Sequence, residues 1–182
     1  ILLIRYGHFT SSRIGHFVFD LAYYLRSREL HQQSRPTLDL FFIDAVLANT
    51  FSIELARRYV RIMPLCRYLY MANKLIPFGY NQVIPLAREI NGSRDVEGIM
   101  AGSPSILKFS QEEESKGHAY LRDIGCIAGK YVCLIVRDEN YLKSQYPEKD
   151  WGAWGYHNHR NSSVDDYRVA TQELADRGYF VI

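Results

Sequence analysis

Four residues near the start of the chain combine types that act on anions and on protons. Arg13 is a cation, and Gly15 lets a ligand approach the backbone closely where a loop becomes a helix. His16 could act as a general base, because the unperturbed pKa of imidazole lies near working pH. Asp20, one helical turn later on the same face, could orient the ring. The alternative is a histidine that packs at a helix end beside a solvating Asp20.

A second charged site follows the apolar run from Tyr131 to Val136, which has the length and composition of a buried strand. Arg137 and Asp138 come directly after it. The carboxyl ends of buried parallel strands are where α/β folds bind ligands, and a guanidinium presents a fixed fork of donors to phosphate. Two alternatives stay open: a surface ion pair between Arg137 and Asp138, or an arginine bonded to nearby loop carbonyls.

A long predicted loop from Glu139 to Asn161 is rich in aromatic side chains. Loops longer than about 12–15 residues are usually functional or disordered, and this aromatic content argues against disorder. Flat rings beside hydrogen-bonding side chains could receive a sugar or a base. His157 and His159 without a third ligand make a poor zinc site, so we expect no metal.

Strand–helix–strand patterns at both ends of the chain would position these residues. Residues 1–4 read as a short buried strand, a helix starts near Ile14, and residues 37–44 read as the next strand. One face of that helix is apolar with the helical period. The residues on that face are Phe17, Val18, Leu21, Tyr24 and Leu25. The sequence therefore predicts an α/β fold with parallel strands.

The carboxyl-terminal unit repeats this order. Ser163 and Asp166 form a capping-box pattern before a helix that runs to Arg177, and the apolar residues 179–182 follow as a strand. Together with residues 131–136 they predict a βαβ unit. Another capping-box pattern, at Ser110 and Glu113, predicts a helix to about residue 124.

Composition excludes some classes of protein. The net charge of +2 is too small for a protein whose main partner is nucleic acid. Neither a signal peptide nor an apolar run of membrane-spanning length is found. Cys66, Cys126 and Cys133 lie in apolar contexts without metal-ligand spacing, which favours reduced core thiols in a cytoplasmic protein.

Between Leu55 and Arg88 the sequence contains no acidic residue, while basic and aromatic residues alternate. The basic residues concerned are Arg57, Arg58, Arg61, Arg67 and Lys74. Such a surface fits the inner face of an anionic membrane or a lipid-phosphate substrate, which would make the protein peripheral to that membrane. The alternative is an ordinary solvated basic face.

Two stretches together resemble a known family. The first is Arg13-Ile14-Gly15-His16-Phe17, with its helix running into Tyr23-Tyr24-Leu25. The second runs from Val136-Arg137-Asp138 through residues 156–162 to Asp166-Tyr167, Ala170, Leu174 and residues 178–182. The chain resembles a family of bacterial glycosyltransferases found among surface-polysaccharide genes. The resemblance covers nearly the whole chain, with its specific residues at the two ends.

This resemblance implies the GT-B architecture of two Rossmann-like domains with the active site between them. The expected domains are an acceptor-side domain at residues 1–128 and the start of a nucleotide-sugar-binding domain at residues 129–182. The second would be incomplete after its first βαβ unit, because family members continue past Ile182, and we expect these residues alone to be inactive. Val136-Arg137-Asp138 is also similar to the H-x-R motif of fucosyltransferases, although Ile135 stands where that motif has its histidine.

The implied activity is transfer of a sugar from a nucleotide-diphosphate sugar to a hydroxyl of a glycan or lipid-linked acceptor, without a resident cofactor. His16 would be the base, Asp20 would orient it, and Arg137 would neutralise the departing diphosphate. The expected substrate-binding residues are Arg13, Gly15, Arg137, Asp138, His157, Arg160, Asn161 and Ser162. Two rival functions are a nucleotide-sugar epimerase with a similar fold and a non-catalytic module that docks on membranes through the basic stretch.

Overall fold

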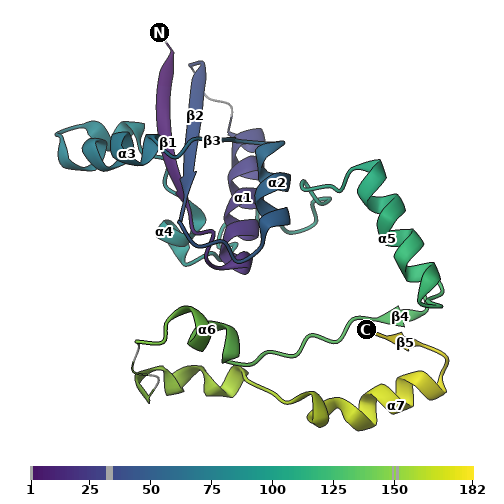
Figure 1. Ribbon diagram of the computed structural model, residues 1–182. Coiled ribbons are helices and arrows are strands. Elements are labelled where there is room, and N and C mark those ends of the chain that lie inside the picture. Colours follow the sequence, from purple (N-terminus) through teal and green to yellow (C-terminus); the bar gives the residue numbers. More distant parts are fainter. Residues whose placement is uncertain (1, 32–34, 149, 151) are drawn as a thin grey trace. The chain divides into compact units, whose positions relative to one another are not determined.

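The computed structural model describes residues 2–31, 35–148, 150 and 152–182 (Figure 1). The protein is mixed α/β with small parallel sheets. Its contacts divide it into two compact units, residues 1–109 and residues 110–182, and each is described by itself. The expected first domain ran to residue 128, whereas the first compact unit ends at residue 109. The domain boundary at 128/129 stays a prediction.

The first unit is built on a parallel sheet. Strand β1 (Leu3–Phe9) pairs with β2 (Thr37–Ile43), and β2 pairs with β3 (Arg61–Ile62), all in parallel. Tyr6 of β1 also forms a parallel bridge with Val83. Since β2 occupies one edge of β1, Val83 lies along the other edge. The spatial order is therefore β3, β2, β1 and then the stretch at Val83, so the chain crosses back over β2 and β1 after β3.

Two helices cover one face of this sheet. Helix α1 (Ile14–Leu30) buries Phe17, Leu21 and Tyr24 against Phe9 and Phe41 of the strands, while Val18 and Leu25 pack at the margin of the same core. This confirms the predicted apolar face. Helix α2 (Thr50–Arg57) adds Ile53 and Ala56 to that core. Its amino end is capped by the side chain of Asn49, which accepts a hydrogen bond of 2.9 Å from the Ser52 amide.

A third helix covers the opposite face. Helix α3 (Cys66–Leu75) buries Cys66 and Tyr70 against Tyr6 and Phe42. Successive side chains of a strand point to opposite faces, so Phe9 and Tyr6 belong to different layers. Figure 1 shows α3 apart from α1 and α2, with the strands between them. The 3-10 helix η1 (Gly79–Gln82) and the short helix α4 (Ala87–Asn91) follow.

The second unit begins with helix α5 (Gln111–Asp123), which has the predicted capping box of Ser110 and Glu113. Strand β4 (Tyr131–Val132) pairs in parallel with β5 (Phe180–Val181). Between these strands lie α6 (Asn140–Gln145), the 3-10 helices η2 (Gly152–Arg160) and η3 (Val164–Tyr167), and α7 (Arg168–Asp176).

The parallel βαβ order of the second unit is confirmed. The predicted capping box of Ser163 and Asp166 is also present, although it starts η3 and the α-helix begins at Arg168. The stretch Glu139–Asn161, which we expected to be a loop, instead contains α6 and η2. The side chains of Tyr141, Trp154 and Tyr156, and Trp151 itself, lie outside the described part of the chain.

The prediction of a buried strand over residues 131–136 is wrong. The ladder continues past β4 only through the hydrogen bond from the Leu134 amide to the Ile182 carbonyl, and Ile135 is 85% exposed. Among the described residues of the second unit only Cys126 is buried, so no second layer covers β4 there. Cys133 is likewise exposed, against the prediction of three core thiols, whereas Cys66 and Cys126 are buried. None of the described helices is both long enough and apolar enough to cross a bilayer.

Candidate functional site

The candidate site lies at the carboxyl end of β1, where the strand order reverses. The chain leaves β1 through Thr10–Arg13 into α1, and the neighbouring stretch leaves Ile84 towards α4, which contacts α1. Open α/β sheets bind ligands outside the carboxyl ends of their strands, where the strand order reverses. His16 and Asp20 on α1 belong to this end of the unit.

A serine connects the two predicted residues. The Nδ1 atom of His16 lies 2.8 Å from the Oγ of Ser93, and that hydroxyl donates to the Oδ1 of Asp20 at 3.1 Å. The backbone N–H of Arg88 also donates to Asp20 Oδ1, at 3.1 Å. We expected Asp20 to contact His16 directly, but these hydrogen bonds connect the two through Ser93. The relay is therefore His16–Ser93–Asp20.

The relay fixes the tautomer of the histidine. An ionised carboxylate only accepts hydrogen bonds, so the one proton of the Ser93 hydroxyl points to Asp20. The Ser93 oxygen must then accept from His16, which places the ring proton on Nδ1. The Nε2 atom of the neutral ring keeps its lone pair and can take a proton from a substrate. In this tautomer the neutral His16 can act as a general base through Nε2.

Burial and charge shift both titrating groups of the relay. Burial lowers the pKa of His16, and the nearby cations Arg88 and Arg13 lower it further. Burial raises the pKa of Asp20, whose side chain is almost fully enclosed, although the hydrogen bonds from Ser93 and from the Arg88 amide oppose that rise. The pKa shift of His16 favours the neutral imidazole that a base requires.

Ser93 occupies a backbone conformation that serine seldom adopts. Its φ is +60°, and it follows Gly92 with φ +66° at the end of α4. Residues other than glycine are rare in this left-handed region and persist there only when their surroundings hold them. The Ser93 amide donates to the carbonyl of Ala87 at 3.1 Å, and its hydroxyl is held by His16 and Asp20. This turn brings a residue 77 positions away to His16.

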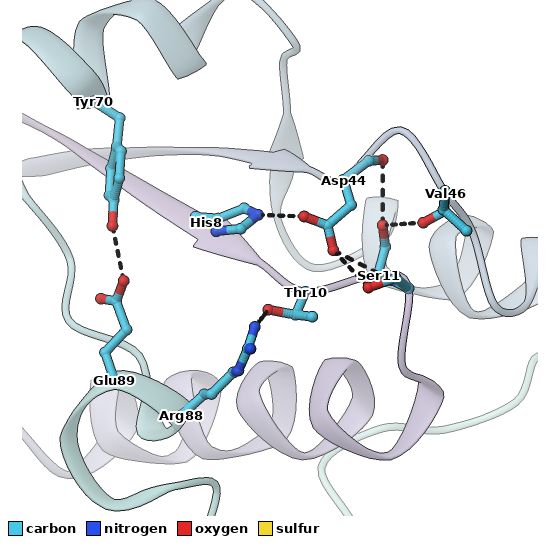
Figure 2. Close-up of polar contacts among 9 residues, drawn as sticks. His8, Thr10, Ser11, Asp44, Val46, Tyr70, Arg88 and Glu89 are labelled. Carbon is cyan, nitrogen blue, oxygen red and sulfur yellow. Dashed lines mark hydrogen bonds and ion pairs between the residues drawn. The ribbon is translucent and has the colours of Figure 1, made fainter. Parts of the chain in front are cut away.

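Helix α4 is tied to both layers of the unit. The guanidinium of Arg88 donates to the Oγ1 of Thr10, just past β1, as Figure 2 shows. Glu89, the next residue, accepts a hydrogen bond of 2.9 Å from the hydroxyl of Tyr70 on α3 (Figure 2). These contacts hold the segment that carries Ser93 against the carboxyl end of β1.

A second histidine lies at the same end of the sheet. The Nε2 of His8 lies 2.8 Å from Asp44 Oδ1, and the ring stacks on Phe42 with 4.5 Å between centroids. Asp44 also accepts from the amide and the hydroxyl of Ser12 at 3.3 and 3.0 Å, and the Ser11 hydroxyl donates to the Asp44 and Val46 carbonyls (Figure 2). The cluster fixes the loop that leads to Arg13.

Sequence reasoning missed His8, Asp44 and Ser93. A signal for the first two was present, because His8 lies near the end of β1 and Asp44 directly follows β2, so parallel pairing brings them together. For Ser93 the sequence offers only the turn-forming Asn91-Gly92 pair before it. That pair predicts a turn but gives no direction for the hydroxyl.

The predicted residues around His16 lie as expected at the start of α1. Arg13 is the amino-terminal cap residue of the helix and is half-buried. Gly15 is exposed, and a Cβ built there would meet no atom within 4 Å. The chain itself therefore does not need glycine at this position for space. The opening beside Gly15 leaves room for a ligand to approach the backbone.

In the second unit the structure brings Arg137 and Ser162 together. The Ser162 amide donates to the Arg137 carbonyl at 3.0 Å, and the Tyr167 hydroxyl donates to Ser162 Oγ at 3.2 Å. The carboxylate of Asp138 accepts from the amide and the side-chain nitrogen of Asn140, at 3.1 and 2.7 Å. Asp138 thus caps the start of α6.

The remaining predicted residues of this unit lie close in sequence to that contact. The Asn161 amide donates to the Asn158 carbonyl at 3.0 Å, and Arg160 is exposed. The side chain of His157 lies outside the described part of the chain. Arg137 is half-buried, past the end of β4. Backbone contacts therefore place the Asn161–Ser162 turn beside Arg137.

A cavity of about 370 Å³ in the first unit is separate from the relay. It is lined by Tyr24 and Arg28 of α1, by His31 directly after that helix, and by Arg5 and Leu86. Neither His16 nor Ser93 is among its lining residues. We take the carboxyl end of β1 as the site instead, because His16 and Asp20, both with shifted pKa values, are linked there beside the strained turn at Ser93.

A scan against protein-family models and searches of curated proteins and of solved structures found no match to this chain.

Proposed function

We propose that the protein is a glycosyltransferase that moves a sugar from a nucleotide-diphosphate sugar to a hydroxyl of a glycan or lipid-linked acceptor. The observation that carries this proposal is the His16–Ser93–Asp20 relay, which leaves a neutral, directed base where the strand order of a parallel sheet reverses. The helices on both faces of that sheet support a Rossmann-like first domain, and the βαβ order of the second unit supports the start of another.

In the proposed reaction His16 acts on the acceptor. Its Nε2 takes the proton of the acceptor hydroxyl while the oxygen of that hydroxyl bonds to the anomeric carbon of the donor sugar. The bond between that carbon and the diphosphate oxygen breaks, and its electron pair stays on the oxygen. Ser93 and Asp20 stabilise the imidazolium that forms, because a positively charged ring donates a stronger hydrogen bond from Nδ1 to Ser93.

Arg137 acts on the donor in this proposal. The diphosphate gains negative charge as it leaves, and a guanidinium can neutralise that charge without a metal. The Ser162 amide donates to the Arg137 carbonyl, so the Asn161–Ser162 turn lies beside Arg137. That turn and the exposed Arg160 directly before it would add donors for the same phosphates. Arg13 and Gly15 would lie next to the acceptor, beside the base.

Transfer by a protein that contains this chain tests the proposal. The assay supplies nucleotide-diphosphate sugars with a glycan or lipid-linked acceptor and measures released nucleotide diphosphate and the new glycoside. We expect His16→Ala to lower the rate roughly 10²- to 10⁴-fold, the usual contribution of a general base. Arg137→Ala should lower it by a similar factor, and Arg122→Ala on the exposed face of α5 serves as the control.

Unchanged turnover in His16→Ala or in Arg137→Ala would remove that residue from the mechanism. Conversion of the nucleotide sugar to an isomer without any acceptor would instead show a nucleotide-sugar epimerase. Product analysis separates the two functions, since only transfer consumes the acceptor.

A further inference from the structure

We infer that the outward side of α3 and the turn after it form a docking surface for a bilayer that carries anionic lipids. We call this surface the α3 outer face and define it by six exposed apolar or aromatic residues and one cation. They are Leu65, Tyr68, Met71, Leu75, Phe78 and Tyr80, together with Arg67. The inference is independent of the sugar transfer proposed above, because it concerns a different layer of the unit.

Helical geometry separates the outer face from the core. Cys66, Tyr70 and Asn73 point to the sheet and are buried, as the spacing of three and four residues requires. Tyr68 and Leu75 lie about half a turn away, so they point from the sheet into solvent. Leu75 is 84% exposed. A helix that is apolar on the side facing away from its own core lacks the polar outer face of an ordinary surface helix.

The turn after α3 extends the same surface. Phe78 is 77% exposed and has a φ of +64°, a conformation that costs a bulky residue backbone strain. Gly79 follows, and a Cβ there would lie 2.1 Å from the carbonyl oxygen of Asn73, so the chain folds tightly back onto the helix. This tight turn displays the aromatic ring of Phe78 in solvent. Tyr80, which follows Gly79, is also exposed.

Charge decides which partner fits the surface. Residues 56–87 contain no aspartate or glutamate, and Arg67 is exposed on one flank of α3. Lys74 lies on the same flank, half-exposed, with its ammonium 3.7 Å from Glu89. A second copy of the chain would bring the same positive charge to the contact. An anionic bilayer supplies the opposite charge, and apolar side chains with tyrosines and a basic flank are typical of helices that lie in the membrane interface.

Vesicle co-sedimentation tests the inference with the whole chain. Vesicles of phosphatidylcholine alone are compared with vesicles that also contain phosphatidylserine, and the partition coefficient is measured. We expect binding to the anionic vesicles. The double variant Leu75→Ser/Phe78→Ser should lower that coefficient at least about tenfold, since two large apolar groups no longer enter the bilayer. Arg67→Gln should lower the partition coefficient for anionic vesicles about fivefold and leave the coefficient for neutral vesicles unchanged.

Matched controls use residues of equal exposure elsewhere. Ile135→Ser/Val169→Ser removes two apolar groups that are 85% and 83% exposed in the second unit, and it should leave the partition coefficient unchanged. Arg122→Gln is the control for Arg67→Gln. Thermal unfolding confirms that each variant is folded, which we expect because every changed side chain is exposed.

Three outcomes would overturn the inference. One is the absence of sedimentation with anionic vesicles, and another is equal loss of binding in the control double variant. The third is self-association of the chain, seen by sedimentation velocity and abolished by Leu75→Ser/Phe78→Ser, which would assign the surface to a second copy. Loss of sugar transfer with intact vesicle binding would affect the proposed function alone.

Discussion

The hydroxyl of Ser93 lies 2.8 Å from Nδ1 of His16 and donates to the carboxylate of Asp20. One serine thereby joins two residues of the same helix that do not need to touch each other. The arrangement differs from a hydrolase triad, in which the histidine lies between the carboxylate and the serine. Here the serine is in the middle and holds the tautomer, and the free edge of the ring faces the substrate side in the proposed reaction.

Removal of the Ser93 hydroxyl should slow transfer by roughly tenfold or more, because the imidazole loses its fixed tautomer and orientation. Ser93→Ala and Ser93→Gly are compared, since glycine relieves the positive φ while alanine does not. Equal losses assign the effect to the hydroxyl. Nitrogen chemical shifts of the His16 ring give a second readout, in which the single tautomer of the parent becomes a mixture. A ring that keeps one tautomer in both variants would contradict the relay.

The pKa of His16 should lie below its ordinary value of 6.5, because of burial and of the charges of Arg88 and Arg13. Transfer should therefore persist below pH 6.5 and fall only as His16 becomes protonated. In the unfolded chain His16 binds its proton at higher pH than in the folded one. This residue therefore lowers the free energy of unfolding as the pH falls from the unfolded pKa towards the lower folded pKa.

An NMR titration of His16 checks both statements. In Arg13→Gln the pKa of His16 should move upward, and the acid limb of the transfer rate should move with it. Lys108→Gln, an exposed change away from the relay, should leave the titration as it is. A His16 that titrates at or above 6.5 in the parent would refute the prediction.

Gly7→Ala should lower the free energy of unfolding by about 1–3 kcal/mol, the usual cost of overpacking. A Cβ at position 7 would lie 2.5 Å from Cε1 of Phe41, a fully buried ring in the core under α1. The matched control is Gly117→Ala on the exposed face of α5, where a Cβ would meet no atom within 4 Å. Alanine should stabilise that helix by about 0.5–1 kcal/mol. Denaturant unfolding measures both, and similar effects at the two sites would exclude the steric explanation.

Arg5→Ala should cost about 3 kcal/mol of stability at neutral pH, because it leaves a buried carboxylate without its cation. Asp39, whose side chain is 1% exposed, accepts from Arg5 at 2.8 and 2.7 Å and from the Tyr24 hydroxyl at 2.6 Å. Burial alone would raise the pKa of Asp39, but the hydrogen bonds from Arg5 and Tyr24 outweigh it and lower that pKa.

The pH dependence of that cost follows from the sign of the shift. With a lowered folded-state pKa, Asp39 contributes stability above its unfolded pKa of about 3.9, and this contribution is lost as the pH falls through the folded value. The cost of Arg5→Ala should thus shrink under acid. Arg177→Ala, which breaks the exposed pair with Glu173, should cost less than about 1 kcal/mol. Unfolding curves at several pH values test this, and a cost that stays constant with pH would contradict it.

Local patterns in the sequence were enough to predict several elements. The apolar face of α1 and the capping boxes at Ser110 and Ser163 were predicted correctly, as was the parallel pairing of β4 with β5. Each of these depends on residues a few positions apart, or on the order of strands and helices. Periodicity and capping therefore describe them without knowledge of the rest of the chain.

Burial was harder to predict in the second unit. The apolar run from Tyr131 to Val136 reads as an interior strand, yet Cys133 and Ile135 are exposed. Hydrophobicity expresses a tendency to be covered, but the cover must come from other elements. The described residues of that unit do not provide it. A strand's own residues can therefore predict its conformation but not its burial.

By itself, the sequence determined that the chain alternates strands and helices and that His16 and Asp20 share a helical face. Only the tertiary structure decided that Ser93 joins them, because this contact connects residues 77 positions apart. Short-range rules follow from the geometry of one helix or strand. Contacts across such separations depend on how the sheet and its two layers of helices bring distant turns together, which no local pattern contains.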